Sequence, residues 1–318
     1  MIRRREFCTS LAILILVATS GCGSRSSAAQ APASDQPILV VTIPTGTPTE
    51  PFVVPTDEPL TPTPPYNDFE TFPAGDFKNS ADITNEWLPL TPGTEFVYEG
   101  QTEDNGGLVT HRLVVDVTDL TKVINGVRSA VTLDQDFKAN QMVETELAFY
   151  AQDSHGNIWR MGEHPEEYQN GQYVEAPTWF AGVNGSYAGI EMLGNPHVGA
   201  PSYSQGWAPS VEFTDRGQVF QVGEAVCVPA DCYKDVLVID ETSQSEPGAH
   251  QLKLFVKGVG NVKVDWRDAD QTQEILELVQ VTRLSAEQLA AVRQRALDEE
   301  QHAYQVSKDV YGQTPPSQ

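Results

Sequence analysis

The sequence has few cysteines and few positively charged side chains. Among its 318 residues there are four Cys, and 20 Lys and Arg stand against 44 Asp and Glu, which gives a formal net charge of −24. A field of that sign repels nucleic acid and anionic lipid head groups. We therefore expect no nucleic-acid partner. Strong negative charge also keeps a tethered protein soluble.

The motifs of the common enzyme classes are also missing. The sequence contains no H-E-x-x-H, no G-x-S-x-G and no phosphate-binding glycine loop, and its six His fall in no recognised metal spacing. We expect no cofactor, no metal and no assignable catalytic residue. Whether the protein is an enzyme is left open by the sequence, with a non-enzyme favoured.

The N-terminal residues 1–21 form a targeting signal peptide, with a basic start and an apolar run too short to span a bilayer. Residues 19–22 (TSGC) resemble the lipobox of bacterial lipoproteins, with Thr19 where that box usually has Leu. The resemblance implies a lipid on Cys22, which would anchor the chain to the outer face of a bacterial membrane, facing the extracellular or periplasmic space. An ordinary secretory signal or an uncleaved anchor is the alternative. Residues 4–7 (RREF) also resemble a twin-arginine signal, and a plain basic region explains them equally well.

After Cys22 the composition changes to Ser, Ala, Pro and Thr. Residues 22–71 predict a disordered Pro/Thr-rich linker, because Pro fixes φ and removes backbone donors. At ~3.1 Å per residue, roughly 50 residues reach about 150 Å when fully stretched. The folded part is predicted as a β-domain over 72–284, and 285–318 as a C-terminal helix and a disordered tail.

Cys227 and Cys232 form the remaining pair, in C-V-P-A-D-C. In an exported chain such a pair indicates a disulfide. A zinc site needs about four ligands and a redox C-x-x-C has two intervening residues, so neither fits this spacing.

Alternating apolar and polar residues separated by turn signals dominate residues 94–284. Residues 142–162 show the pattern best: a strand with Phe149 on one face, a turn over 153–157, and a second strand beginning with Ile158 and Trp159. Asn-Gly pairs mark further hairpins. The fold class is therefore mainly β: one large curved antiparallel sheet, as a meander, half-barrel or sandwich. Ser285 and Gln288 form a capping box that starts one C-terminal α-helix, expected to dock lightly and to fray after Asp298.

Residues 176–210 differ from the rest, because they are rich in Gly, Pro and large apolar side chains. They predict an irregular cover over one face of the sheet, either packed as core or forming the rim of an apolar cavity. We expect a ligand at this cover, whose candidate binding residues are Trp179, Phe180, Tyr187, Met192, Tyr203 and Trp207.

Two acidic features allow a functional interpretation and a plainer one. Asp153, His155 and Asn157 could ligate calcium, but turn chemistry explains the same residues. The pairs Asp134/Asp136 and Glu144/Glu146 each share a strand face and could serve an acid-dependent hydrolase. The favoured interpretation of these pairs is acids facing solvent in a strongly negative chain.

Three segments together resemble a group of uncharacterised exported bacterial proteins that are often predicted lipoproteins. They are WLPLTPGTEFVYEG (87–100), FYAQDSHGNIW (149–159) and KGVGNV (257–262). A lipobox, a linker and a long β-meander are also similar, more distantly, to periplasmic lipoprotein carriers of the Lol type. Those carriers hold acyl chains in a curved antiparallel sheet, so the resemblance implies an apolar or lipid-like ligand.

Three functions follow from these observations. The first is a lipid-anchored binding module for an apolar or amphipathic ligand. The second is a structural or interaction domain of the cell envelope without a small ligand. The third and weakest is a hydrolase that uses acids such as Asp134 and Asp136.

Overall fold

The computed structural model describes residues 65–318. The predicted signal peptide 1–21, the predicted lipid site Cys22 and most of the predicted linker lie outside the described residues. The described chain makes tertiary contacts before Phe72, where the β-domain was expected to begin. The Phe69 ring stacks on Tyr187 with centroids 4.8 Å apart, and Glu70 Oε2 accepts a hydrogen bond from the Ser204 amide at 3.0 Å.

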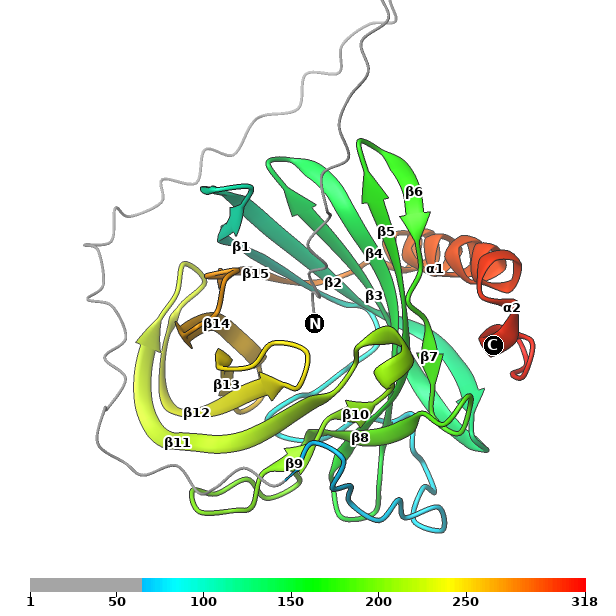
Figure 1. Cartoon of the computed structure of the whole chain (residues 1–318), viewed down its shortest axis with the longest axis horizontal. Coiled ribbons are helices and arrows are strands. Elements are labelled where there is room, and N and C mark those ends of the chain that lie inside the picture. Colours follow the sequence, from blue (N-terminus) through cyan, green and yellow to red (C-terminus); the bar gives the residue numbers. More distant parts are fainter. Residues whose placement is uncertain (1–64) are drawn as a thin grey trace, which may run out of the picture. The chain divides into compact units, whose positions relative to one another are not determined.

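One antiparallel sheet curls until it nearly closes into a barrel (Figure 1). Its strands follow the order β10-β8-β5-β4-β3-β2-β1-β15-β14-β13-β12-β11-β9, and β6 and β7 pair with β5. Most neighbours in the sheet are also neighbours in the chain, so the predicted meander is confirmed. The strands are β1 (Thr94–Asp104), β2 (Gly107–Ile124), β3 (Val127–Lys138), β4 (Gln141–Gln152), β5 (Ile158–Gln169), β6 (Gln172–Glu175), β7 (Trp179–Phe180), β8 (Tyr187–Met192), β9 (Tyr203–Ser204), β10 (Gly206–Trp207), β11 (Asp215–Cys227), β12 (Cys232–Ser243), β13 (Ala249–Val256), β14 (Gly260–Asp268) and β15 (Ile275–Arg283).

The hairpin between β2 and β3 shows why the turns fall where they do. Asn125 and Gly126 take φ values of 49° and 78°, both in the left-handed region. Two central residues with φ > 0 define the type I′ turn, whose twist matches that of the flanking strands. Asn and Gly are the residues that reach this region at least cost, so the predicted hairpin signal is confirmed here.

The strand pair at residues 142–162 has the predicted alternation. Phe149 is fully buried and Trp159 is 2% exposed, as expected for core residues. Both belong to a cluster on the convex side of the sheet, together with Met161, Phe180 and Tyr311. The convex face of these strands therefore holds one large apolar cluster of the fold.

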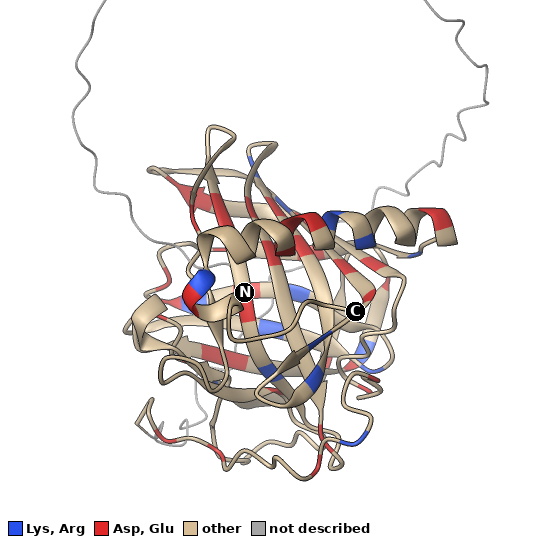
Figure 2. Ribbon diagram, turned by 90° about the vertical axis from the view of Figure 1, so that its right-hand side faces the viewer, with Lys and Arg blue, Asp and Glu red and all other residues tan. Residues whose placement is uncertain are grey.

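Two C-terminal helices complete that core, α1 (Ala286–Val306) and α2 (Lys308–Tyr311). Helix α1 lies across the outside of the sheet (Figure 2). Ser285 Oγ accepts from the Gln288 amide while the Gln288 side chain accepts from the Ser285 amide, so the predicted capping box is confirmed. Val292, Ala296 and Ala303 are its buried apolar contacts.

The expected fraying of this helix after Asp298 is wrong, since α1 continues to Val306. Polar contacts stabilise the last turns. Lys122 Nζ of β2 donates to Glu300 Oε1 at 2.7 Å and to the Pro315 carbonyl at 2.9 Å, and Thr145 Oγ1 of β4 donates to Glu299 Oε2 at 2.8 Å. These partners come from distant strands, so the helix is held more firmly than its few buried apolar residues alone would hold it.

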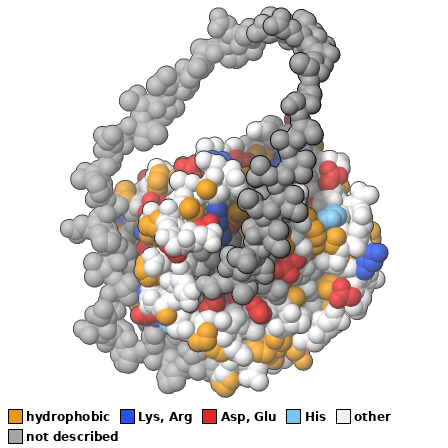
Figure 3. Space-filling view, turned by 45° about the horizontal axis from the view of Figure 1, so that its top comes forward, with side chains coloured by type: hydrophobic (Ala, Val, Ile, Leu, Met, Phe, Trp, Pro, Cys, Tyr) orange, Lys and Arg blue, Asp and Glu red, His pale blue; other side chains and the backbone are white. Residues whose placement is uncertain are grey.

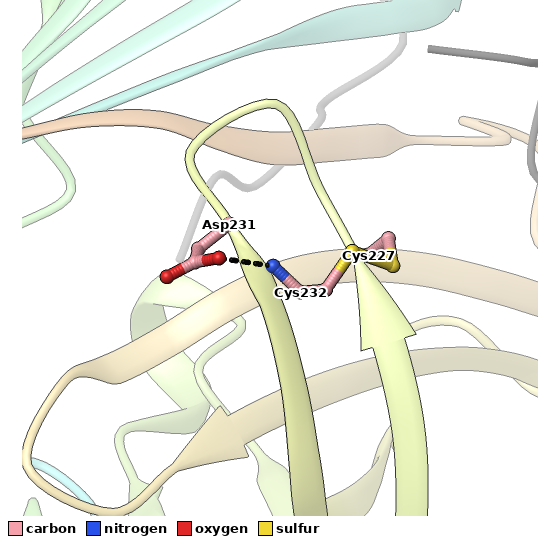
Figure 4. The surroundings of a disulfide bond; sticks show 3 residues. All are labelled: Cys227, Asp231 and Cys232. Carbon is pink, nitrogen blue, oxygen red and sulfur yellow. Dashed lines mark hydrogen bonds between the residues drawn. A yellow bond between two sulfur atoms is a disulfide. The ribbon is translucent and has the colours of Figure 1, made fainter.

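The disulfide between Cys227 and Cys232 is confirmed, and it closes the end of the β11–β12 hairpin (Figure 4). The two Cα atoms are 4.0 Å apart. Asp231 Oδ1 accepts a hydrogen bond from the Cys232 amide at 2.8 Å, which holds the turn in place. This link fastens two neighbouring strands rather than distant parts of the sheet.

Acidic side chains lie scattered among uncharged and hydrophobic ones on the face seen in Figure 3. Within residues 65–318, no helix combines the length and the apolar character that crossing a membrane requires.

Candidate binding site on the concave face

The register of β3 and β4 places four carboxylates on the concave face of the sheet. Thr145 points to helix α1 on the convex side, so its neighbours Glu144 and Glu146 point the other way. Asp134 pairs directly with Glu146 and Asp136 with Glu144. Residues paired across two strands share a face, so the four acids lie together on the inside of the curved sheet.

The interpretation of these acids as solvent-facing is wrong. Asp136 and Glu146 are each 2% exposed and Glu144 is 7% exposed. An antiparallel sheet can leave one face in water, but this sheet curls onto itself and covers its inner face. The polar half of the predicted alternation therefore lies inside the fold.

Arg160 of β5 is the central cation of the concave face. Its guanidinium donates to Glu163 Oε2 at 2.8 Å, to Glu191 Oε2 at 3.0 Å and to the Tyr150 hydroxyl at 2.9 Å. Glu146 Oε1 lies 3.6 Å from Arg160 Nη1. One buried cation thus connects strands β4, β5 and β8.

The pKa values on this face differ according to how near each carboxyl lies to a cation. Burial raises the pKa of Glu191, but Arg160 and Lys253 outweigh burial and lower it to about 2. Burial raises the pKa of Glu146 to about 7, with Glu163 and Asp134 adding repulsion that Arg160 only partly offsets. Arg160 therefore compensates Glu191 much better than Glu146.

A second cation and a histidine pair with other carboxylates of the concave face. Lys253 Nζ of β13 lies 2.8 Å from Glu241 Oε2 of β12, and Glu241 Oε1 accepts from Gln205 at 2.6 Å. His111 Nε2 lies 2.7 Å from Asp136 Oδ1, while its Nδ1 lies 3.2 Å from Glu274 Oε1. Such paired rings and ammonium groups fit a polar lining rather than an apolar core.

The segment 176–210 contributes strands to the edge of the sheet as well as loops. Of its six predicted binding residues, Phe180 belongs to the convex cluster, whereas Trp179 pairs with Glu163 and so shares the concave face. Tyr187 is 52% exposed. The ring of Phe69 contacts both Tyr187 and Trp207. Met192 and Tyr203 are both buried. The structure thus separates these residues into several environments, and their role in binding stays a prediction.

Trp179 is connected to the charged cluster through the ring of Phe213. Its ring centroid is 4.8 Å from that of Phe213, and the Arg160 guanidinium carbon lies 5.8 Å from the Phe213 centroid. The Trp179 indole Nε1–H is buried, with no hydrogen-bond partner among the described residues. A side chain on Gly206 would meet the Trp179 and Phe213 rings, so the close backbone approach there depends on glycine.

Arg160, Lys253 and His111 are the site residues that the sequence did not reveal. Each one occurs alone, outside any recognised motif, and each meets its carboxylate partners only through strand pairing. The alternation of polar and apolar residues was the available signal. A cation on the polar face of one strand lies beside the acids on the same face of the neighbouring strand.

The Asp153 turn and two surface hollows lie outside this face. Asp153 Oδ1 accepts from the His155 and Asn157 amides, both at 2.9 Å, and Oδ2 accepts from the Trp159 indole at 2.9 Å, so turn and core contacts occupy this carboxylate. An open depression of about 530 Å³ lies between residues 77–82 and 126–128. A pocket of about 20 Å³ beside Asp240 has room for about one water molecule.

Comparison with protein-family models and with curated proteins finds no match. Two solved structures share limited likeness: a protein of Bacteroides fragilis that is thought to be exported and has a YmcC-like fold, and one of Parabacteroides distasonis that is thought to be a lipoprotein. The identities are 11% and 12%, and the TM-scores are 0.34 and 0.33. Each match covers 63% of this chain and 100% of the other. At these values the likeness carries no inference about function.

Proposed function

We propose that this protein is a non-catalytic binding module of the bacterial cell envelope. Lipid on Cys22 anchors it to the outer face of a membrane, the linker spaces the β-domain from that surface, and the concave face of the sheet holds an amphipathic ligand. The lipobox and the Pro/Thr-rich composition support the first two parts.

One observation carries the binding role: several buried charged side chains gather among aromatic and aliphatic ones on the inside of the sheet. Glu146, Glu163 and Glu191 surround Arg160, with the Tyr150 ring beside it. Burying several charges costs stability, and buried groups with displaced pKa values cluster at functional sites. A purely structural barrel would gain more from apolar packing.

Native mass spectrometry tests the proposal. The Cys22→Ala chain, exported and purified without detergent, avoids competition by detergent molecules. We expect a co-purifying compound at about one per chain, released by organic solvent, together with a shift of the protein from the membrane to the soluble fraction. A chain that carries no compound and binds no added amphiphile would contradict the binding role and favour an envelope domain without a small ligand.

A further inference from the structure

Acidic groups greatly exceed basic ones on the concave face. Among the described residues, the cationic side chains within ion-pair distance of its carboxylates are Arg160, Lys253 and His111. Within residues 65–318 this imbalance gives the concave face a negative field. The carboxylates are Asp134, Asp136, Glu144, Glu146, Glu163, Glu167, Glu191, Glu241 and Glu274.

The cations are already engaged by other carboxylates. Arg160 donates to Glu163 and Glu191, and Lys253 pairs with Glu241. Because each guanidinium or ammonium has a limited number of donors, neither of these two cations donates to Glu144.

Glu144 is the least compensated of these acids. It is 93% buried (7% exposed), and among the described residues it has no hydrogen-bond or ion-pair partner. Its neighbours raise the demand for positive charge, since Asp136 lies directly opposite on β3 and Glu167 directly opposite on β5. A carboxylate between two others on one sheet face is destabilised by both.

We propose that the ligand of the concave face carries a positively charged amine or ammonium group, which binds between Glu144 and the facing acids of β3. This inference rests on the proposed binding role and specifies the ligand's chemical class. An organic cation fits better than a metal ion, because no group of three or more His, Cys, Asp or Glu within residues 65–318 is arranged to hold one. The negative field also disfavours fatty acids and other anions.

Three ligands of equal chain length test the charge: decylammonium, decanol and decanoate, titrated into the purified Cys22→Ala chain by calorimetry. We expect decylammonium to bind about tenfold or more tightly than decanol, and decanoate to bind more weakly than both. A Glu144→Gln/Glu146→Gln variant should lose about tenfold for decylammonium and little for decanol. The matched control is Glu86→Gln/Glu99→Gln, which removes two acids of exposed ion pairs (71% and 55% exposed) and should change nothing.

Each outcome has a distinct meaning. Equal binding of decanol and decylammonium, unchanged in the Glu144/Glu146 variant, would overturn the inference and leave the binding role intact. Failure of all three ligands to bind would contradict both the inference and the proposed binding role. If the Glu144→Gln/Glu146→Gln variant does not fold, the pH dependence of binding to the Cys22→Ala chain with both acids intact provides a second readout. Decylammonium binding should weaken from pH 8 to pH 5 as Glu144, Glu146 and Asp134, whose pKa values burial raises, take up protons, and pH-independent binding would overturn the inference. The acids that face Glu144 from the neighbouring strands are Asp136 on β3 and Glu167 on β5.

Discussion

Asp134 of β3 and Glu146 of β4 lie directly opposite each other on the concave face of the sheet. Two like charges in this position repel, and Glu146 is buried while Asp134 is half-buried. Burial raises the pKa of Asp134 to about 6 and that of Glu146 to about 7. The fold therefore tolerates an arrangement that costs stability at neutral pH.

This pair predicts how stability changes with pH. A Glu in the unfolded chain titrates near 4.5, whereas Glu146 keeps its proton up to about pH 7 in the folded state. Between these values the folded state binds more protons, so the free energy of unfolding falls as the pH rises. Urea unfolding of Glu144→Gln/Glu146→Gln should show a decline between pH 4.5 and pH 7.5 that is smaller than the wild-type decline by roughly 2 kcal/mol.

His164 works in the opposite direction, since burial lowers its pKa despite Glu166. It is present in both proteins, so its contribution cancels in the difference. A pH profile of equal slope in the variant and the wild type would refute the assignment of the raised pKa values to these acids.

The buried ion pair of Lys122 and Glu300 predicts a large effect on the helix. Lys122→Met leaves Glu300 buried without its cation, which should cost about 3–5 kcal/mol in the free energy of unfolding. The matched control is Lys257→Met, because the Lys257–Glu86 pair is exposed and should contribute about 1 kcal/mol or less. Urea unfolding measures both changes. Similar costs for the two variants would show that burial does not decide how much an ion pair contributes to the free energy of unfolding.

Closure of the sheet depends on Gly189 of β8. A Cβ atom there would lie less than 3.0 Å from backbone atoms of Ser204, Gln205 and Gly206. Gly189→Ala should therefore destabilise the fold by about 2 kcal/mol or more. Gly107→Ala, where a Cβ meets nothing within 4 Å, is the control and should change stability by less than about 0.5 kcal/mol. Thermal unfolding of both variants gives the comparison, and tolerance of Ala at residue 189 would mean that the edge strands can separate.

The disulfide closes a short loop, so its contribution should be modest. Replacing Cys227 and Cys232 together by Ser should cost about 2 kcal/mol by the loop-entropy estimate. Hydrogen exchange should locate the loss at the end of the β11–β12 hairpin. Faster exchange across the whole sheet would instead indicate that this hairpin end supports the entire fold.

Residues 142–162 show how much of the fold is local. The alternation that put Phe149 on one face and Glu146 on the other is confirmed, because strand geometry is a short-range property. The same pattern could not reveal that the face of Glu146 is covered. That depends on β11–β14, which lie about a hundred residues later in the chain and curl round to enclose it.

Helix α1 shows the same limit. Ser285 and Gln288 predicted its start because a capping box is local. Its end at Val306 depends on Lys122, which is distant in sequence and pairs with Glu300. A charged residue buried by a remote partner leaves no periodic apolar signal, so the apolar pattern in the sequence ends before the helix does.

The sequence by itself determined the strands, the hairpin turns, the disulfide and the class of fold, because each depends on neighbouring residues and on backbone preferences. Only the tertiary structure decided that Arg160, Lys253 and nine carboxylates meet on one concave face. The physical reason is that charge compensation acts through space. Which acid faces which cation is decided by strand order and register, and a single chain pattern does not contain that information.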